Sequence, residues 1–302
     1  MAEKTGIAWT DSTFNPWIGC TKVGPGCDHC YAEALDKRHR WKGDTHWGVG
    51  KPRMRTSRSN WAKPLAWNRA RLKDGKTHRV FCASLADVFD NEVPEEWRID
   101  LFDLIHATPA LTWLLLTKRI GNVQKMFPGG HYDNAWIGAT MVNREEARRD
   151  APKLLAVQGF AKRFVSFEPA IEAVDWAEFP GIDWIIVGGE STQAGHAARP
   201  FDLAWARTTV QQCKDAGVPA FVKQLGSMPI GCFGGPGSVV CPRCHARTDL
   251  MGGHLTDEEC AKRSQHPIKL KDRAGADPDE WPEDLRVQEF PMNTVDRIRA
   301  GK

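Results

Sequence analysis

The sequence predicts an α/β fold, a TIM-like (partial) parallel β/α barrel. From residue 79 onward, short apolar runs rich in β-branched and aromatic residues alternate with amphipathic stretches. This alternation is typical of βα units whose strands are buried on both faces. Polar residues follow nearly every run, and in a barrel these strand ends converge on one mouth. An open doubly wound sheet fits the alternation as well, but the polar strand ends favour the barrel.

Six apolar runs are expected to form strands, at residues 80–84, 112–117, 136–140, 164–167, 184–188 and 220–224. A further strand is expected near residues 5–9 or 15–19. Helices are expected between them. Pro94 stands in the first turn of one helix, and Asn143 caps a second over residues 144–157. Asp202 caps a third, which Gly217 closes.

The chain has 302 residues, of which 41% are hydrophobic, so it can bury one full-sized core. We expect residues 1–225 to form the barrel, 226–268 a Cys/His-rich insert, and 269–302 a tail that packs on the barrel. No apolar run approaches the ~20 residues of a membrane span, and a secretory signal is lacking, so a cytoplasmic protein is expected. Nine cysteines, an odd number, then favour metal or redox chemistry over disulfides.

Three cysteines lie in the segment NPWIGCTKVGPGCDHC, residues 15–30. Thiolates are soft ligands that suit iron–sulfur clusters and zinc, and the Gly-Pro-Gly turn lets the loop fold back. Structural zinc needs a fourth ligand, for which His29 is near, whereas three thiolates on a [4Fe–4S] cluster leave one iron open. We therefore expect a 4Fe–4S cluster on Cys20, Cys27 and Cys30. The alternatives are a zinc site completed from elsewhere and buried inert cysteines.

The cysteine segment and the Tyr-Ala-Glu after it resemble the phage-associated radical-SAM-like three-cysteine barrel family of unknown function. The other stretches that carry this resemblance are FCASLADVF (81–89), LLTKR (115–119), SFEP (166–169), GGES (188–191), VKQ (222–224) and WPEDLR (281–286). The resemblance implies a radical-SAM barrel, distantly similar to spore photoproduct lyase, in a bacterial or phage-infected host cell. It also implies S-adenosylmethionine (SAM) as cofactor and a reductase or flavodoxin-type electron donor. Most radical-SAM enzymes space their cysteines C-x3-C-x2-C, whereas this chain reads C-x6-C-x2-C.

SAM on the open iron would need an acid for its amine and donors for its carboxylate. Polar residues at the strand ends are the candidates for binding this cofactor: Ser84, Asp87, Thr117, Thr140, Glu168 and Glu190. Lys118 and Lys223 are the candidate catalytic residues, and together with Arg119 they could hold a carboxylate or phosphate. The alternative is structural ion pairing, of Lys118 with Glu168 or of Lys223 with Glu190.

A basic, Trp-rich insertion is expected over residues 37–79, which hold 14 Lys and Arg and four of the 13 tryptophans. Cations neutralise phosphates and tryptophan stacks on bases, so the composition predicts a nucleic-acid or nucleotide partner. The candidate nucleic-acid-binding residues are Arg53, Arg55, Arg58, Trp61 and Lys63. A solvated charged surface over packed tryptophans is the alternative.

The insert over residues 226–268 carries a second group of metal-ligand residues. Cys241 and Cys244 have zinc-knuckle spacing, and Cys260 with His254 could complete four ligands, with Cys232, His245 and His266 as alternative ligands. Zinc would supply folding energy that a Gly- and Pro-rich insert cannot obtain from a core. A second cluster and unligated thiols are the alternatives.

These residues together favour an iron–sulfur, radical-SAM-like enzyme that modifies or repairs nucleic acid or a nucleotide by reductive cleavage of SAM. A second hypothesis is a non-catalytic or non-SAM Fe–S or zinc protein that binds nucleic acid or a protein partner. A third is a zinc hydrolase with Glu168 or Glu190 as base, which the scarcity of well-spaced histidines disfavours.

Overall fold

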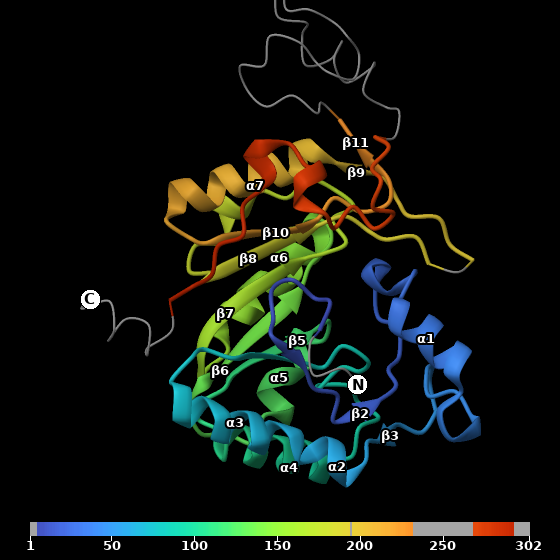
Figure 1. Ribbon diagram of the computed structural model, residues 1–302, viewed down its shortest axis with the longest axis vertical. Coiled ribbons are helices and arrows are strands. Elements are labelled where there is room, and N and C mark those ends of the chain that lie inside the picture. The colour runs from blue at the N-terminus through green and yellow to red at the C-terminus, as the bar shows by residue number, and fades with distance from the viewer. Residues whose placement is uncertain (1–4, 194, 232–267, 293–302) are drawn as a thin grey trace, which may run out of the picture. The chain divides into compact units, whose positions relative to one another are not determined.

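The computed structural model describes residues 5–193, 195–231 and 268–292, which belong to two compact units (Figure 1). The first unit comprises residues 1–141 and 145–166, and the second comprises 142–144 and 167–302. The metal ligands expected at Cys241, Cys244, His254 and Cys260 lie outside the described residues.

The first unit is built on parallel strands in the order β1-β4-β5-β6-β7. Hydrogen bonds join each strand to the next in parallel register. The middle of β5 is a continuous apolar run, as is typical of a strand buried on both faces, and the second halves of β6 and β7 are buried in the same way. Their bounds are β1 Ser12–Thr13, β4 Arg79–Cys82, β5 Thr112–Thr117, β6 Tyr132–Thr140 and β7 Phe160–Phe167.

Helices connect these strands. The principal ones are α1 Tyr31–His39, α2 Arg58–Trp61, α3 Lys63–Asp74, α4 Glu95–His106, α5 Ile120–Met126 and α6 Arg144–Ala156. The short helices η1 Pro25–Cys27 and η2 Trp41–Gly43 flank α1. A two-stranded antiparallel ribbon joins β2 Trp17–Ile18 to β3 Met54–Arg55, so the cysteine segment and the basic insertion are paired through their backbones.

Gly138 of β6 is a point of close approach in the core of this unit. It lies opposite Phe164 of β7 in the parallel register. A methyl group added at Gly138 would come within 2.3 Å of Cζ of that buried ring. Glycine is therefore required here for space rather than for backbone conformation.

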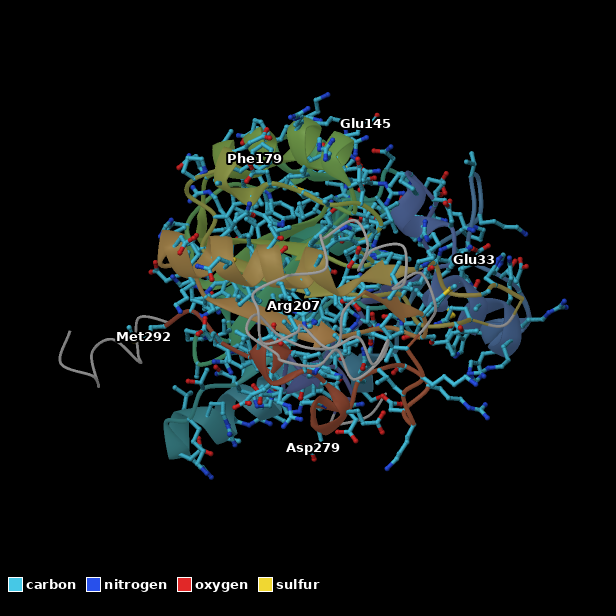
Figure 2. All side chains as sticks on the ribbon, turned by 90° about the horizontal axis from the view of Figure 1, so that it is seen from above. Glu33, Glu145, Phe179, Arg207, Asp279 and Met292 are labelled. Carbon is cyan, nitrogen blue, oxygen red and sulfur yellow. The ribbon has the colours of Figure 1, made fainter. Side chains whose placement is uncertain are left out.

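The second unit contains the parallel pair β8 Trp184–Gly188 and β10 Ala220–Gln224. Its other elements are η3 Trp176–Glu178, β9 Phe201–Asp202, α7 Leu203–Ala216, β11 Pro229–Ile230, η4 Pro278–Glu280 and η5 Glu283–Leu285. Asp202 caps α7 by accepting a 2.9 Å hydrogen bond from the Ala204 amide. Figure 2 shows Arg207 on this helix, where its Nε lies 2.6 Å from Oδ2 of Asp284.

The predicted α/β class, a partial TIM-like fold of parallel strands and helices, is confirmed. All six expected strands are present, as are the helices expected after Pro94, Asn143 and Asp202. The first strand, Ser12–Thr13, lies between the two ranges expected for it. No helix within the described ranges is long and apolar enough to cross a membrane.

Candidate functional site

The cysteine loop begins at the carboxyl end of β1 and is fixed to residues that follow β4. The buried Asn15 accepts a 2.7 Å hydrogen bond from the Leu85 amide through Oδ1. Its Nδ2 donates to Oγ of Ser84 at 3.0 Å. The Gly19 amide donates to the Leu85 carbonyl at 3.0 Å. The segment that leads to Cys20 is thus held at two neighbouring strand ends, where sites form in parallel β/α folds.

The three cysteines occupy different local structures within this loop. Cys20 lies in the irregular segment after β2, Cys27 ends η1, and Cys30 is the residue that caps α1. All three are free thiols. In the described part of the chain, no three His, Cys, Asp or Glu side chains are grouped closely enough to hold a metal ion. Three free thiols match the ligands of a thiolate-bound cluster in kind and in number, but in this structure their sulfur atoms are not grouped closely enough to hold a metal.

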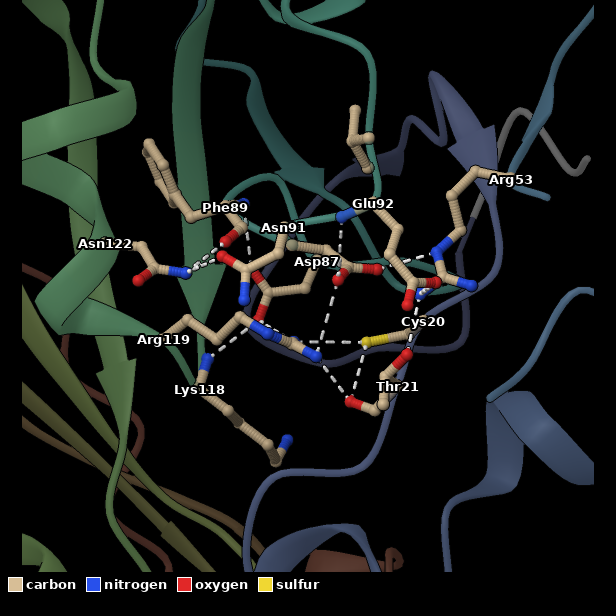
Figure 3. A network of polar contacts seen from close by, with 12 residues as sticks. Cys20, Thr21, Arg53, Asp87, Phe89, Asn91, Glu92, Lys118, Arg119 and Asn122 are labelled. Atoms are coloured by element: carbon tan, nitrogen blue, oxygen red, sulfur yellow. Dashed lines mark hydrogen bonds and ion pairs between the residues drawn. The ribbon is translucent and has the colours of Figure 1, made fainter. Parts of the chain in front are cut away.

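A polar network surrounds the first cysteine (Figure 3). Nη1 of Arg119 lies 3.3 Å from Sγ of Cys20 and 3.2 Å from Oδ2 of Asp87. Nη2 of Arg119 donates to the Thr21 carbonyl at 2.5 Å. The network therefore brings the loop against the residues that follow β4 and β5.

Asp87 organises the strand-end residues in this network. Its Oδ1 accepts a 2.7 Å hydrogen bond from the Thr117 hydroxyl, and its Oδ2 accepts a 3.0 Å hydrogen bond from the Lys118 amide. Three of the sequence-predicted site residues thus meet beside Cys20. Sequence reasoning placed Arg119 at the same strand end, but it gave no sign that Arg119 contacts the cysteine.

Burial and the surrounding charges set the ionisation of this network. Burial raises the pKa of Cys20 to about 12. The nearby Asp87 carboxylate raises this pKa further, whereas Arg119 lowers it. Burial alone would lower the pKa of Arg119, but Asp87, Cys20 and Asp90 outweigh it and raise that pKa. At neutral pH the site therefore pairs a neutral Cys20 thiol with a charged Arg119 guanidinium.

Two other predicted residues of the first unit remain without side-chain partners. The Thr140 hydroxyl, at the carboxyl end of β6, is buried and has no hydrogen-bond partner among the described residues. Lys118, which Figure 3 shows beside the network, is half-buried, and its ammonium group forms no hydrogen bond or ion pair with the described residues. Both side chains thus keep a polar group available for a ligand.

The predicted acids of the second unit are engaged with cations. Lys223 forms an ion pair with Glu168. Arg199 binds Glu190 through Nε at 3.0 Å and through Nη2 at 2.7 Å. Ion pairing was the alternative interpretation for these residues, and Lys223 pairs with Glu168 rather than with Glu190.

The basic insertion divides into buried and exposed cations. The side chain of Arg53 is fully buried and lies 2.7 Å from both Asp90 and Glu92. Arg53 therefore has no face for a phosphate, contrary to its expected role. Arg55 pairs with Asp100, and its guanidinium lies 4.4 Å from the ring centroid of Trp61, which it covers on one side. Arg58 is exposed and Lys63 is half-buried.

Arg53 instead braces the cysteine loop. Its Nη1 donates to the carbonyls of His46, Gly48 and Lys51 at 2.8–3.2 Å. Its Nη2 donates to Oγ1 of Thr21 at 2.7 Å. The segment fixed in this way returns a hydrogen bond of 2.9 Å from the Gly48 amide to the Cys20 carbonyl.

Gly19 packs against His46 and Arg53 of the same segment. Its φ of +113° is in the region that favours glycine, and an added methyl group would lie 2.4 Å from the His46 carbonyl oxygen. The glycine before the first cysteine was the one sequence sign of this close contact.

Comparisons with known proteins give one family and a set of remote structures. No curated protein matches the chain. Three solved structures are similar to it, all of spore photoproduct lyase: a double mutant with bound AdoMet and dinucleoside spore photoproduct, a single mutant, and a complex with dinucleoside spore photoproduct. Their sequence identities are 12%, 12% and 11%, and their TM-scores are 0.36, 0.39 and 0.34.

The matches cover 68%, 70% and 66% of this chain, and 50%, 64% and 58% of the respective lyase chains. The chain thus spans less than two thirds of the length of each lyase. The family model with the description "Protein of unknown function (DUF5131)" matches residues 4–268, and the chain belongs to this family.

Proposed function

We propose that the chain is an iron–sulfur enzyme of the radical-SAM type that acts on nucleic acid or a nucleotide. The observation that carries the proposal is the position of Cys20. It is the first of three free thiols in one loop, and it lies against Arg119 and Asp87 at the carboxyl ends of parallel strands. Reactive sites of parallel β/α folds form at these ends, whereas a purely structural metal site has no need of them.

Cys20, Cys27 and Cys30 would hold the cluster. Three thiolates leave one iron of a [4Fe–4S] cluster without a protein ligand, which is the position a cofactor can take. When bound, the cluster and SAM supply one-electron radical chemistry. Asp87 holds Thr117 and the Lys118 backbone in place, and the Lys118 ammonium is left to bind a carboxylate or phosphate. Thr140 adds a buried hydroxyl at the next strand end.

The test is reconstitution without oxygen. The full chain is loaded with iron and sulfide, reduced with dithionite and given SAM, and 5′-deoxyadenosine is then measured by chromatography. We expect about four iron and four sulfide per chain and a product that depends on SAM. Cys20→Ser and Cys27→Ser should lose both cluster and product. Cys213→Ala, which changes a buried thiol of α7, should keep both.

The outcomes separate the hypotheses. If the wild-type chain takes up no iron and sulfide, the cluster proposal is wrong. If a cluster forms and SAM is not cleaved, the enzyme is excluded and the non-SAM iron–sulfur protein becomes the better interpretation. Extra zinc in the loaded chain would point to the second group of cysteines, without changing the dependence of the product on Cys20.

Nucleic acid as the substrate is supported by the exposed part of the basic insertion. Arg58 is exposed, and its side chain forms no hydrogen bond or ion pair with the described residues. Binding of a single-stranded oligonucleotide should weaken linearly in log Kobs against log salt. Arg58→Ala should reduce that slope by about 0.7, the share of one phosphate on a single strand. Lys125→Ala, an exposed lysine of α5, is the matched control and should leave the slope unchanged. Affinity independent of salt would refute a phosphate-binding surface.

A further inference from the structure

The guanidinium of Arg119 lies directly against the sulfur of the first cysteine. Nη1 is 3.3 Å from Sγ of Cys20, and Nη2 is 2.5 Å from the carbonyl oxygen of Thr21. A guanidinium is planar and rigid, so these two contacts fix the sulfur and the following carbonyl relative to each other. Arg119 therefore determines where the first ligand of the loop lies.

The positive charge of Arg119 is maintained although the group is buried. Its side chain is 7% exposed, and it lies between Asp87, at 3.2 Å, and Asp90, at 3.6 Å. These two carboxylates offset the cost of burying the cation. Because water is largely excluded, salt and solvent screen the charge only weakly at the cysteine sulfur.

We propose that Arg119 is a positioning residue that holds Cys20 as a cluster ligand and sets how readily the cluster accepts an electron. This inference rests on the proposed function. The reduction potential of an iron–sulfur cluster depends on nearby charge and on hydrogen bonds to its sulfur atoms. When the cluster takes one electron from a reductant, its charge becomes more negative by one. A cation that donates to a ligand sulfur stabilises this reduced form and raises the midpoint potential.

The same geometry predicts opposite effects for the two partners of the Arg119–Asp87 pair. Removing the cation leaves the cysteine beside Asp87 without its arginine partner, while Asp90 stays paired with Arg53, so Arg119→Gln should lower the midpoint potential. Removing the carboxylate leaves the cation less neutralised, so Asp87→Asn should raise it. A general disturbance of packing would give no reason for opposite signs.

The experiment is a redox titration of the reconstituted full chain without SAM, followed by electron paramagnetic resonance. At the wild-type midpoint, Arg119→Gln should lower the ratio of reduced to oxidised cluster about tenfold, which for one electron is about 59 mV. Arg119→Lys keeps the charge and should lie between wild type and Arg119→Gln. Arg207→Gln, which breaks an arginine–aspartate pair of the second unit, is the matched control and should leave the potential unchanged.

Cluster loading of the wild-type chain is measured first, by its iron and sulfide content. If the wild type does not load, the proposed function fails and this inference falls with it. If it loads and Arg119→Gln and Asp87→Asn leave the potential unchanged, or move it in the same direction, only this inference is overturned. If Arg119→Gln does not fold, Arg119→Lys and Asp87→Asn still decide between these results. Loss of iron from Arg119→Gln but not from Arg119→Lys would support the positioning role.

Discussion

Replacement of Arg53 by methionine tests whether the basic insertion braces the cysteine loop. The Arg53 side chain is completely buried, and its Nε lies 2.7 Å from Oδ2 of Asp90, which is itself 2% exposed. Breaking a buried pair on one side costs about 3–5 kcal/mol because the remaining charge is uncompensated. Asp90 would still have Arg119 at 3.6 Å, so the cost of leaving its carboxylate without Arg53 should lie at the lower end of that range. The carbonyls of three loop residues also lose a charged donor. We therefore expect a loss of about 4 kcal/mol in the free energy of unfolding.

The measurement is urea unfolding at pH 7, followed by tryptophan fluorescence and circular dichroism. Arg58→Met is the matched control, since it removes an exposed arginine of the same insertion, and it should change the free energy by less than about 0.5 kcal/mol. The double variant Arg53→Met/Asp90→Asn should lose less free energy of unfolding than the sum of the two single variants, because it leaves no Asp90 carboxylate without its Arg53 partner. If Arg53→Met and Arg58→Met destabilise equally, the buried brace does not exist and the insertion is only a charged surface.

Three smaller predictions concern other positions. Gly138→Ala should destabilise the protein by about 1–3 kcal/mol because its methyl group would overlap the Phe164 ring, whereas Gly6→Ala, with nothing within 4 Å, should not; equal urea midpoints would contradict this. Burial lowers the pKa of His78, so the folded chain binds this proton less readily than the unfolded chain, and stability should fall as the pH drops from about 6.5. His78→Gln should remove that part of the pH dependence of unfolding, and an unchanged profile would disprove the assignment. Burial raises the pKa of Cys213 to about 12, so iodoacetamide should leave this thiol unmodified until the protein unfolds, as mass spectrometry can show; rapid labelling of the native protein would count against the packing described here.

The parallel strands could be predicted because burial on both faces leaves a direct trace in the sequence. The run Thr112–Thr117 is apolar throughout its middle, and the structure begins and ends β5 at the same residues. The first strand was harder to locate. Ser12–Thr13 is short and polar, and the side chain of the nearby buried Asn15 finds its hydrogen-bond partners at Ser84 and Leu85, about 70 residues later.

The roles of the cations could not be predicted from the sequence, because a sequence shows charge but not burial. Arg53 has the same local composition around it as Arg58, yet its carboxylate partner Asp90 comes 37 residues later. The pairing of Lys223 with Glu168 is of the same kind, since it joins residues 55 positions apart. The contact of Arg119 with Cys20 spans 99 positions, so only the fold shows that a residue at the end of β5 reaches the cysteine loop.

The spacing between the first two cysteines has a mechanical consequence. The sulfur of Cys20 contacts Arg119 and its carbonyl accepts a hydrogen bond from the Gly48 amide, whereas Cys30 is the residue that caps α1. The residues between Thr21 and Cys27 form the loop that joins these two positions, and Val23 in this loop is 46% exposed. Each added residue gives such a loop up to ~3.5 Å of extra reach. The longer C-x6-C spacing therefore lengthens the chain between Cys20 and Cys27, while Lys22 within it contacts the Asp28 carbonyl at 3.0 Å and Glu33 of α1 at 2.9 Å and so holds this longer loop against the start of the helix.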